Sequence, residues 1–143
     1  MTVEQISIFL ENKAGRLAEV THHLAQAGIN IRALSLADTS DFGILRLLVD
    51  DHEKAKDALK DKGFTVGRTA VVAVEVPDRP GGLDDILQLL SEHSINVEYM
   101  YAFVRQNCNN AVLVFRFDRS DDAVAVLQKG SFKVIPDTEL CAI

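Results

Sequence analysis

The sequence has little that would support a membrane span, a disulfide framework or a nucleic-acid surface. Its apolar runs, such as residues 71–74 and 111–115, are far too short to cross a bilayer. Two lone cysteines, Cys108 and Cys141, do not make a disulfide framework or a metal-binding knuckle. The net charge is −6, whereas a phosphate-backbone partner normally requires a basic face. We therefore expect no membrane segment and no nucleic-acid partner.

Export, cofactor and catalytic signals are also missing. Residues 1–5 contain no basic region and no cleavage pattern, so we expect a cytoplasmic protein. The GxGxxG and Walker patterns are absent, which argues against a nucleotide-binding loop. His22 and His23 are adjacent on a predicted helix, where neighbouring side chains point apart, so a shared metal is not expected. Cys108 has no histidine beside it, and no catalytic set can be assembled. We expect no cofactor, no metal and no enzymatic activity.

The apolar residues that are present follow first a strand period and then a helix period. Residues 3–10 alternate between apolar and other residues, which predicts a strand. Leu17, Val20 and Leu24 then recur at helical spacing, and Gly28 is typical of the residue that ends a helix. The rest of the first half predicts strands at residues 29–36 and 42–49, a helix that follows Asp51 and ends at Gly63, and a short strand at residues 64–66. The predicted order is βαββαβ.

The second half of the chain repeats the first. A shift of 66 residues aligns Gly15 with Gly81, Leu17 with Leu83, Leu24 with Leu90, Ile29 with Ile95 and Asn30 with Asn96. After a longer hairpin at residues 105–110, a shift of 68 aligns Leu45 with Leu113, Asp50 with Asp118, Ala55 with Ala123, Leu59 with Leu127 and Phe64 with Phe132. These matches fall on helix starts, strand starts and core positions, which indicates two copies of one structural unit.

Two βαββαβ units predict an α+β protein of two ferredoxin-like sandwiches. Each sandwich has an antiparallel four-stranded sheet with two helices on one face. We expect domain 1 at residues 1–69 and domain 2 at residues 70–143. The connector at residues 67–69 contains no flexible spacer, and units of about 70 residues have small cores, so we expect them to pack together.

The sheet face opposite the helices is expected to be apolar. Alternation places on it Phe9, Leu34, Leu36, Ile44 and Leu48 in the first unit, and Met100, Ala102, Val112 and Val114 in the second. An apolar open face suggests that another sheet or subunit covers it. We therefore expect a homodimer that uses these faces.

Two similar turns join a strand to a helix, at residues 12–17 (NKAGRL) and 78–83 (DRPGGL). The first N–H groups of a helix lack intrahelical partners and lie at the positive end of its dipole, so they favour an anion such as a carboxylate. Glycine in the turn permits a close approach. Each turn is either a ligand-binding loop or only a tight connection.

These features together resemble tandem ACT domains. Each unit has a D/N-x-x-G-x-L turn after its first strand and an asparagine that opens its second strand. The second copy is close to the family pattern, whereas the first carries Asn12 and Ala14 where Asp and Pro are common. The resemblance implies that domains pair side by side. It also implies that small ligands, usually amino acids, bind between the turn of one unit and the second strand of its neighbour.

The candidate ligand-binding residues implied by this resemblance are Asn12, Lys13, Ala14, Gly15, Arg16, Leu17, Asn30, Ile31, Asp78, Arg79, Pro80, Gly81, Gly82, Leu83, Asn96 and Val97. Helix-start amides can bind the carboxylate of an amino acid, and Asn12 or Asp78 can accept hydrogen bonds from its ammonium group. In the alternative reading, Asn12 and Asp78 only cap the turns, and Asn30 and Asn96 only cap the strand entries.

The leading hypothesis is a non-catalytic regulatory protein that binds a small molecule, an amino acid by resemblance. Its output would be an unidentified protein partner or a change in assembly. The alternative is a structural or protein-interaction module of ferredoxin-like fold with no small ligand, and a small enzyme is a third possibility. The sequence does not identify the ligand.

Overall fold

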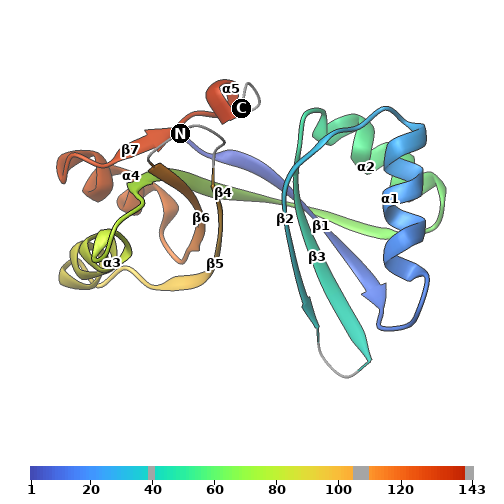
Figure 1. The fold of residues 1–143 in the computed structure, drawn as a ribbon, viewed down its shortest axis with the longest axis horizontal. Helices are drawn as coiled ribbons and strands as arrows, with labels where there is room; N and C mark the ends of the chain where they lie inside the picture. Colours follow the sequence, from blue (N-terminus) through green and yellow to red (C-terminus); the bar gives the residue numbers. More distant parts are fainter. Residues whose placement is uncertain (39–40, 105–109, 141–143) are drawn as a thin grey trace. The chain divides into compact units, whose positions relative to one another are not determined.

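The computed structural model of the chain describes residues 1–38, 41–104 and 110–140 (Figure 1). Both cysteines, part of the turn at residues 38–41 and most of the hairpin at residues 105–110 lie outside the described residues. The chain splits into two compact units: Glu4–Thr69, here called the first unit, and Ala70–Ile143 with Met1–Val3, called the second unit.

The first unit has the predicted βαββαβ order. Its elements are β1 (Val3–Glu11), α1 (Arg16–Gln26), β2 (Ile31–Asp38), β3 (Phe42–Val49), α2 (His52–Asp61) and the first part of β4 (Thr65–Pro77). The strand order in this part of the sheet is β2-β3-β1-β4, with β3 antiparallel to both of its neighbours. Helices α1 and α2 cover one face of the sheet (Figure 1). This arrangement is the expected ferredoxin-like sandwich.

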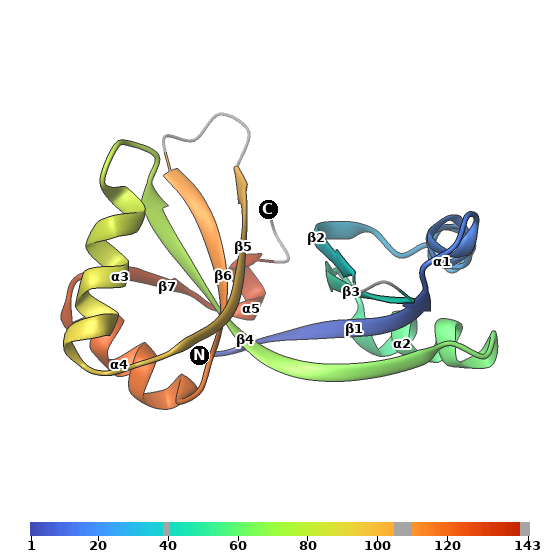
Figure 2. The same cartoon turned by 90° about the horizontal axis from the view of Figure 1, so that it is seen from below.

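The second unit repeats this arrangement. Its elements are the second part of β4, α3 (Gly82–Glu92), β5 (Val97–Val104), β6 (Asn110–Phe117), α4 (Ser120–Lys129), β7 (Lys133–Ile135) and a short helix α5 (Asp137–Leu140). The strand order is β5-β6-β4-β7, and the pairs are antiparallel. Helices α3 and α4 lie on the same face of this sheet (Figure 2). The short helix α5 is an addition that the sequence pattern did not predict.

Strand β4 differs from the prediction because it continues through the expected connector. The sequence suggested a strand at residues 64–66 and a connector at residues 67–69, but β4 is one strand of 13 residues. Val66, Thr69 and Val71 are β-branched residues that favour extended backbone. The strand contains no proline before its last residue, Pro77. The last strand of the first unit is therefore continuous with the first strand of the second.

Each unit has its own apolar core between its sheet and its helices. In the first unit, Val20 and Leu24 of α1 and Ala55 and Leu59 of α2 are buried against the sheet. The equivalent core residues of the second unit's helices are Ile86, Leu90, Ala123 and Leu127. The helical spacing in the sequence predicted these faces.

The helix ends show the duplication at the level of the backbone. Gly28 follows α1 with a φ of 73°, as predicted from its position, and Ser94 follows α3 with a φ of 55°. The next residue donates in each case to a carbonyl five positions back, from Ile29 to Leu24 at 2.9 Å and from Ile95 to Leu90 at 3.0 Å. The chain thus keeps the same left-handed turn with glycine in one unit and serine in the other.

The predicted placement of Leu34 and Leu36 on the open sheet face is wrong. Leu34 is opposite Leu47 and Leu36 is opposite Leu45, and both partners belong to the helix-side core. Directly opposed residues share a face of the sheet. A bulge between Ile31 and Ala33 adds one residue to β2, and the alternation then continues on the opposite face.

The placement of Met100 and Ala102 is wrong for the same reason. A bulge between Val97 and Tyr99 brings Met100 opposite Phe115 and Ala102 opposite Leu113, on the helix side. The other predicted open-face positions, which lie outside the bulged strands, are on that face as expected: Phe9, Ile44, Leu48, Val112 and Val114. Of these, Leu48, Val112 and Val114 are buried, and Phe9 is 49% exposed.

Candidate functional site

The turn between β1 and α1 is held by backbone hydrogen bonds. The N–H of Asn12 donates to the Asp41 carbonyl at 2.8 Å, and the N–H of Lys13 donates to the Glu11 carbonyl at 2.9 Å. Gly15 caps α1 with a φ of 90°, which is costly for any residue with a Cβ atom. The glycine predicted from the motif is therefore required by the backbone.

The start of α1 leaves backbone donors without a protein acceptor. The N–H of Arg16 reaches the Lys13 carbonyl at 3.4 Å, and the N–H of Glu19 donates to Gly15 in the first regular helical bond. Among the described residues, no acceptor is present for the N–H groups of Leu17 and Ala18. These two groups are the ones that a bound anion would meet at the positive end of the helix dipole.

A hollow of about 230 Å³ adjoins this turn. Its lining consists of Leu10, Glu11, Asn12, Lys13, Leu17, Leu36 and Gly43. A more open depression of about 530 Å³ shares three of these residues and adds Asp41 and Phe42. The hollow therefore combines one acidic, one basic and one amide side chain with three leucines.

The charges around the hollow are balanced. Lys13 Nζ lies 3.3 Å from the Glu11 carboxylate, and Arg16 lies 3.9 Å from Glu11 and 2.8 Å from Glu19. The Arg16 guanidinium also stands 4.9 Å from the centre of the Phe64 ring, which fixes its position by a cation–π contact. Both signs of charge are thus available to a ligand within one small site.

Asn30 and Ile31, the other candidates in the first unit, lie at the opposite end of α1. An 11-residue helix is about 16 Å long at about 1.5 Å per residue, so it separates them from the turn. The N–H of Asn30 donates to the Asp50 carboxylate at 3.0 Å, and the N–H of Asp50 donates back to the Asn30 carbonyl at 3.2 Å. Within one unit, the structure does not bring the two halves of the predicted site together.

The turn of the second unit has the same backbone shape but different side-chain contacts. Gly81 caps α3 with a φ of 85°. Arg79 lies 3.2 Å from Asp85 and also donates to the Pro80 carbonyl. The Asp78 side chain is exposed and has no hydrogen bond or ion pair with any residue that the structure describes.

Gly82 is not one of the free donors at this turn. Its N–H donates to the Arg79 carbonyl at 3.0 Å, so the next available helix-start amides are those of Leu83 and Asp84. Gly82 instead allows close packing, because an added Cβ atom would lie 2.3 Å from the Pro77 carbonyl oxygen. The motif glycines therefore have two different roles, one for backbone conformation and one for space.

Asn96 and Val97 line a separate hollow of about 310 Å³ at the C-terminal end of α3. Its other lining residues are Leu87, Leu90, Ser91, Ser94 and Ile95. The Asn96 N–H donates to Asp118 at 3.1 Å, which repeats the contact of Asn30 with Asp50. The sequence did not single out Asp50 or Asp118 as partners of these asparagines, although their matching positions in the two repeats were a usable signal.

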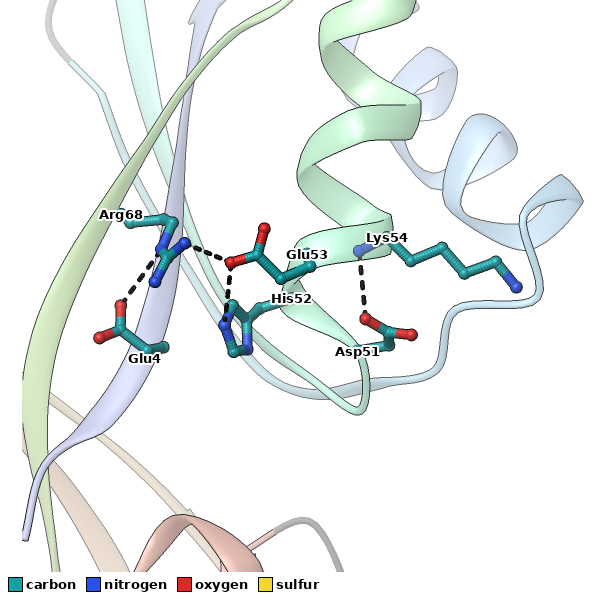
Figure 3. A network of polar contacts seen from close by, with 6 residues as sticks. All are labelled: Glu4, Asp51, His52, Glu53, Lys54 and Arg68. Carbon is teal, nitrogen blue, oxygen red and sulfur yellow. Dashed lines mark hydrogen bonds and ion pairs between the residues drawn. The ribbon is translucent and has the colours of Figure 1, made fainter.

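The polar network in Figure 3 connects β1, β4 and α2 of the first unit. Arg68 contacts Glu53, its Nε lies 3.5 Å from Glu4, and His52 lies 3.7 Å from Glu53. Asp51 accepts a hydrogen bond from the Lys54 N–H at 3.1 Å and caps α2. The ion pairs are partly or fully exposed, and such pairs contribute little stability, so we treat this network as surface structure.

The described part of the chain holds neither a candidate membrane span nor a candidate metal site. No helix there is long and apolar enough to cross a membrane. No group of three or more His, Cys, Asp or Glu residues in that part is arranged to hold a metal ion.

Two ferredoxin-like units with a glycine turn before the first helix of each define a tandem ferredoxin-like protein. The family model described as "ACT domain pair" matches residues 1–143, and the chain belongs to this family. Protein BT0572 from Bacteroides thetaiotaomicron is similar at 43% identity with a TM-score of 0.94, and the match covers 100% of this chain and 98% of that one.

Two other similar structures share the fold at lower identity. The regulatory subunit of aspartate kinase from Thermus thermophilus matches at 16% identity with a TM-score of 0.65, over 88% of this chain and 91% of that one. The corresponding subunit from Thermus flavus matches at 18% identity with a TM-score of 0.63, over 87% and 88%. Among curated proteins, the search found no match.

Proposed function

We propose that the chain is a non-catalytic regulatory protein that binds a free amino acid at the turn between β1 and α1. The hollow beside residues 11–17 is the observation that carries this proposal. It adjoins the start of α1, where two amides have no acceptor among the described residues, and its lining has both signs of charge and an apolar wall. Membership of the ACT domain pair family supports the same conclusion.

A zwitterion matches the charges of this hollow. A ligand carboxylate can accept from the N–H groups of Leu17 and Ala18 and from Lys13, while a ligand ammonium can donate to Glu11 or Asn12. Glu11 and Lys13 already pair at 3.3 Å. A ligand that carries both charges can replace each partner of this pair and leave no charge unmatched.

The size and the apolar wall narrow the ligand class. Drug-sized ligands occupy pockets of roughly 300–1,000 Å³. The hollow of about 230 Å³ is smaller and suits a molecule of amino-acid size. Leu10, Leu17 and Leu36 would contact its side chain, which favours an apolar side chain over a charged one.

The second turn is proposed as a differently specific site. Its carboxylate, Asp78, suits a ligand ammonium, and its available amides, those of Leu83 and Asp84, are equivalent to those of Leu17 and Ala18 in the first turn. We retain the proposal that Asn30, Ile31, Asn96 and Val97 contribute from neighbouring units, since each lies far from the turn of its own unit. We also keep residues 1–69 and 70–143 as the proposed domains, and a protein partner or an assembly change as the proposed output.

A purely structural module is the second candidate. The reciprocal contacts of Asn30 with Asp50 and of Asn96 with Asp118 favour it, because they give both asparagines a structural role. This candidate predicts that no small molecule stabilises the protein.

A thermal-shift screen over the twenty amino acids separates the two candidates. A ligand that binds only the native state raises the free energy of unfolding by about 2.7 kcal/mol at a hundred times its Kd. We expect one or a few amino acids to raise Tm, and amides of the same amino acids, which lack the carboxylate, to have no effect. An unchanged Tm with every amino acid at millimolar concentration would contradict the proposal.

A further inference from the structure

The side chain of Arg16 lies beside the hollow at the β1–α1 turn but does not line it. Arg16 is the first residue of α1, and its side chain is 26% exposed. The lining of the hollow includes Glu11 and Lys13 but not Arg16. An effect of the Arg16 side chain on a ligand in the hollow therefore passes through a neighbour that lines it.

Two contacts fix the position of the Arg16 guanidinium. Its Nη1 donates to the Glu19 carboxylate at 2.8 Å, and its Cζ atom lies 4.9 Å from the centre of the Phe64 ring. Phe64 is 6% exposed and belongs to the core of the first unit. A planar guanidinium can bind a carboxylate and stack on an aromatic ring at the same time. Arg16 therefore has less freedom than Glu11 and Lys13, whose side chains are more than half exposed.

The two carboxylate oxygens of Glu11 have different partners. Oε2 lies 3.3 Å from Lys13 Nζ, and Oε1 lies 3.9 Å from Arg16 Nη2. The second distance is that of an ion pair without a hydrogen bond. In the binding mode proposed above, the ligand carboxylate binds Lys13, and the ligand ammonium replaces Lys13 beside Glu11. Because Arg16 is outside the hollow, it can keep its contact with Oε1 while Oε2 changes partner.

We propose that Arg16 is a positioning residue of this site, and that it holds Glu11 so that Oε2 faces the ammonium group of the bound amino acid. The inference rests on the proposed function and narrows it, because it assigns the ammonium to Glu11. A glutamate side chain has several rotatable bonds, and ordering it on binding costs entropy. Contact with Arg16 orders Glu11 before the ligand arrives, so the native chain binds more tightly than a chain without this contact.

The second turn has no equivalent of this arrangement. The shift of 66 residues places Gly82 at the position of Arg16 and Pro77 at the position of Glu11. Neither residue has a charged side chain, yet α3 begins after a left-handed glycine as α1 does. The start of the helix therefore does not itself require an arginine, and the positioning role is specific to the first turn.

A double-mutant cycle tests whether Arg16 acts through Glu11. The probe is the one of the twenty standard L-amino acids that raises Tm most in the thermal-shift screen, and calorimetry gives its Kd. We expect Arg16→Gln to raise Kd about three- to tenfold in the native background. In the Glu11→Gln background the same change should raise Kd less than about twofold. A residue that only supported the fold would raise Kd by the same factor in both backgrounds.

Arg68→Gln is the matched control. Arg68 also contacts two glutamates of the first unit, Glu4 and Glu53, but it does not line the hollow, so this variant should leave Kd unchanged. Circular dichroism checks that every variant is folded. Arg16→Met keeps an apolar side chain beside the Phe64 ring, and it takes the place of Arg16→Gln in the cycle if that variant is unfolded.

Two results would overturn the role of Arg16 alone. One is a probe that binds the Arg16 variant as tightly as the native chain, and the other is equal weakening with and without Glu11. If none of the twenty amino acids binds the native chain, the proposed function fails and the role of Arg16 fails with it. The two failures are distinguishable, because only the second abolishes binding to the native chain.

Discussion

The backbone N–H of Asn96 donates to the Asp118 carboxylate at 3.1 Å, and the N–H of Asp118 donates back to the Asn96 carbonyl at 3.2 Å. This reciprocal pair joins the start of β5 to the end of β6, the two strands whose register contains the bulge. Asn30 and Asp50 make the same pair in the first unit, at 3.0 and 3.2 Å.

Asp118→Ala should lower the free energy of unfolding by up to about 1 kcal/mol, because it removes an acceptor from the Asn96 N–H in an exposed setting. Urea denaturation gives this difference. Asp118→Asn keeps an oxygen acceptor and should recover at least half of the loss. A loss in the asparagine variant equal to that in the alanine variant would show that charge, and not the hydrogen bond, matters here.

Gly82→Ala should destabilise the protein by about 1–3 kcal/mol, since the added Cβ would lie 2.3 Å from the Pro77 carbonyl oxygen and 3.3 Å from Val76. The matched control is Gly67→Ala in β4, where an added Cβ meets no atom within 4 Å. Gly67 does not have a positive φ, so its substitution should be neutral or stabilising by up to about 1 kcal/mol. Equal unfolding midpoints for the two variants would contradict this account of Gly82.

Ser94→Gly should stabilise the protein by about 0.5–1 kcal/mol. A left-handed conformation costs roughly 1–2 kcal/mol for a residue with a Cβ atom, and the greater chain entropy of glycine offsets only part of that gain. Gly28 already occupies the equivalent position in the first unit. The reciprocal change Gly28→Ser should therefore destabilise by a similar amount, and thermal unfolding of both variants tests whether the effects have opposite signs.

Lys13→Gln and Asn12→Ala should weaken binding of the amino acid found by the thermal-shift screen. Loss of one charge-assisted hydrogen bond costs about 1.5–3 kcal/mol, which is roughly a 10- to 150-fold increase in Kd by calorimetry. Lys54→Gln is the control, since it removes an exposed lysine of α2 that lies near Gly28, at the opposite end of α1 from the turn. Asp78→Ala tests the second turn separately. If none of the three turn variants changes Kd, the ligand binds elsewhere.

Much of the fold could be predicted from the sequence because its signals are local. Alternation identified β1 and β3, helical spacing identified the buried faces of α1 and α2, and repetition of these patterns established the duplicated βαββαβ order. The turn glycines Gly15 and Gly81 were also predictable, because a left-handed backbone conformation at a helix start favours glycine whatever the rest of the fold is. The close association of the two units stays a prediction.

Part of the candidate site required the tertiary structure. The sequence placed the Gly82 amide among the carboxylate donors, whereas the folded turn uses it to bind the Arg79 carbonyl. Leu36 was assigned to the open sheet face, whereas it lines the hollow beside Lys13 and Leu17. Neither result could be obtained from the motif, because both depend on where a neighbouring segment comes to lie.

The sequence by itself determined the repeat, the order of the elements, the helix faces and the two glycine turns. Only the tertiary structure decided on which face of the sheet the side chains of β2 and β5 lie after their bulges. It also decided that β4 runs unbroken through residues 67–69 and which helix-start amides have no acceptor among the described residues. The physical reason is the range of the interactions. Periodicity and turn conformation depend on residues close in sequence. A bulge instead depends on how a strand pairs with a strand distant in sequence, and its one extra residue moves every later side chain to the opposite face of the sheet.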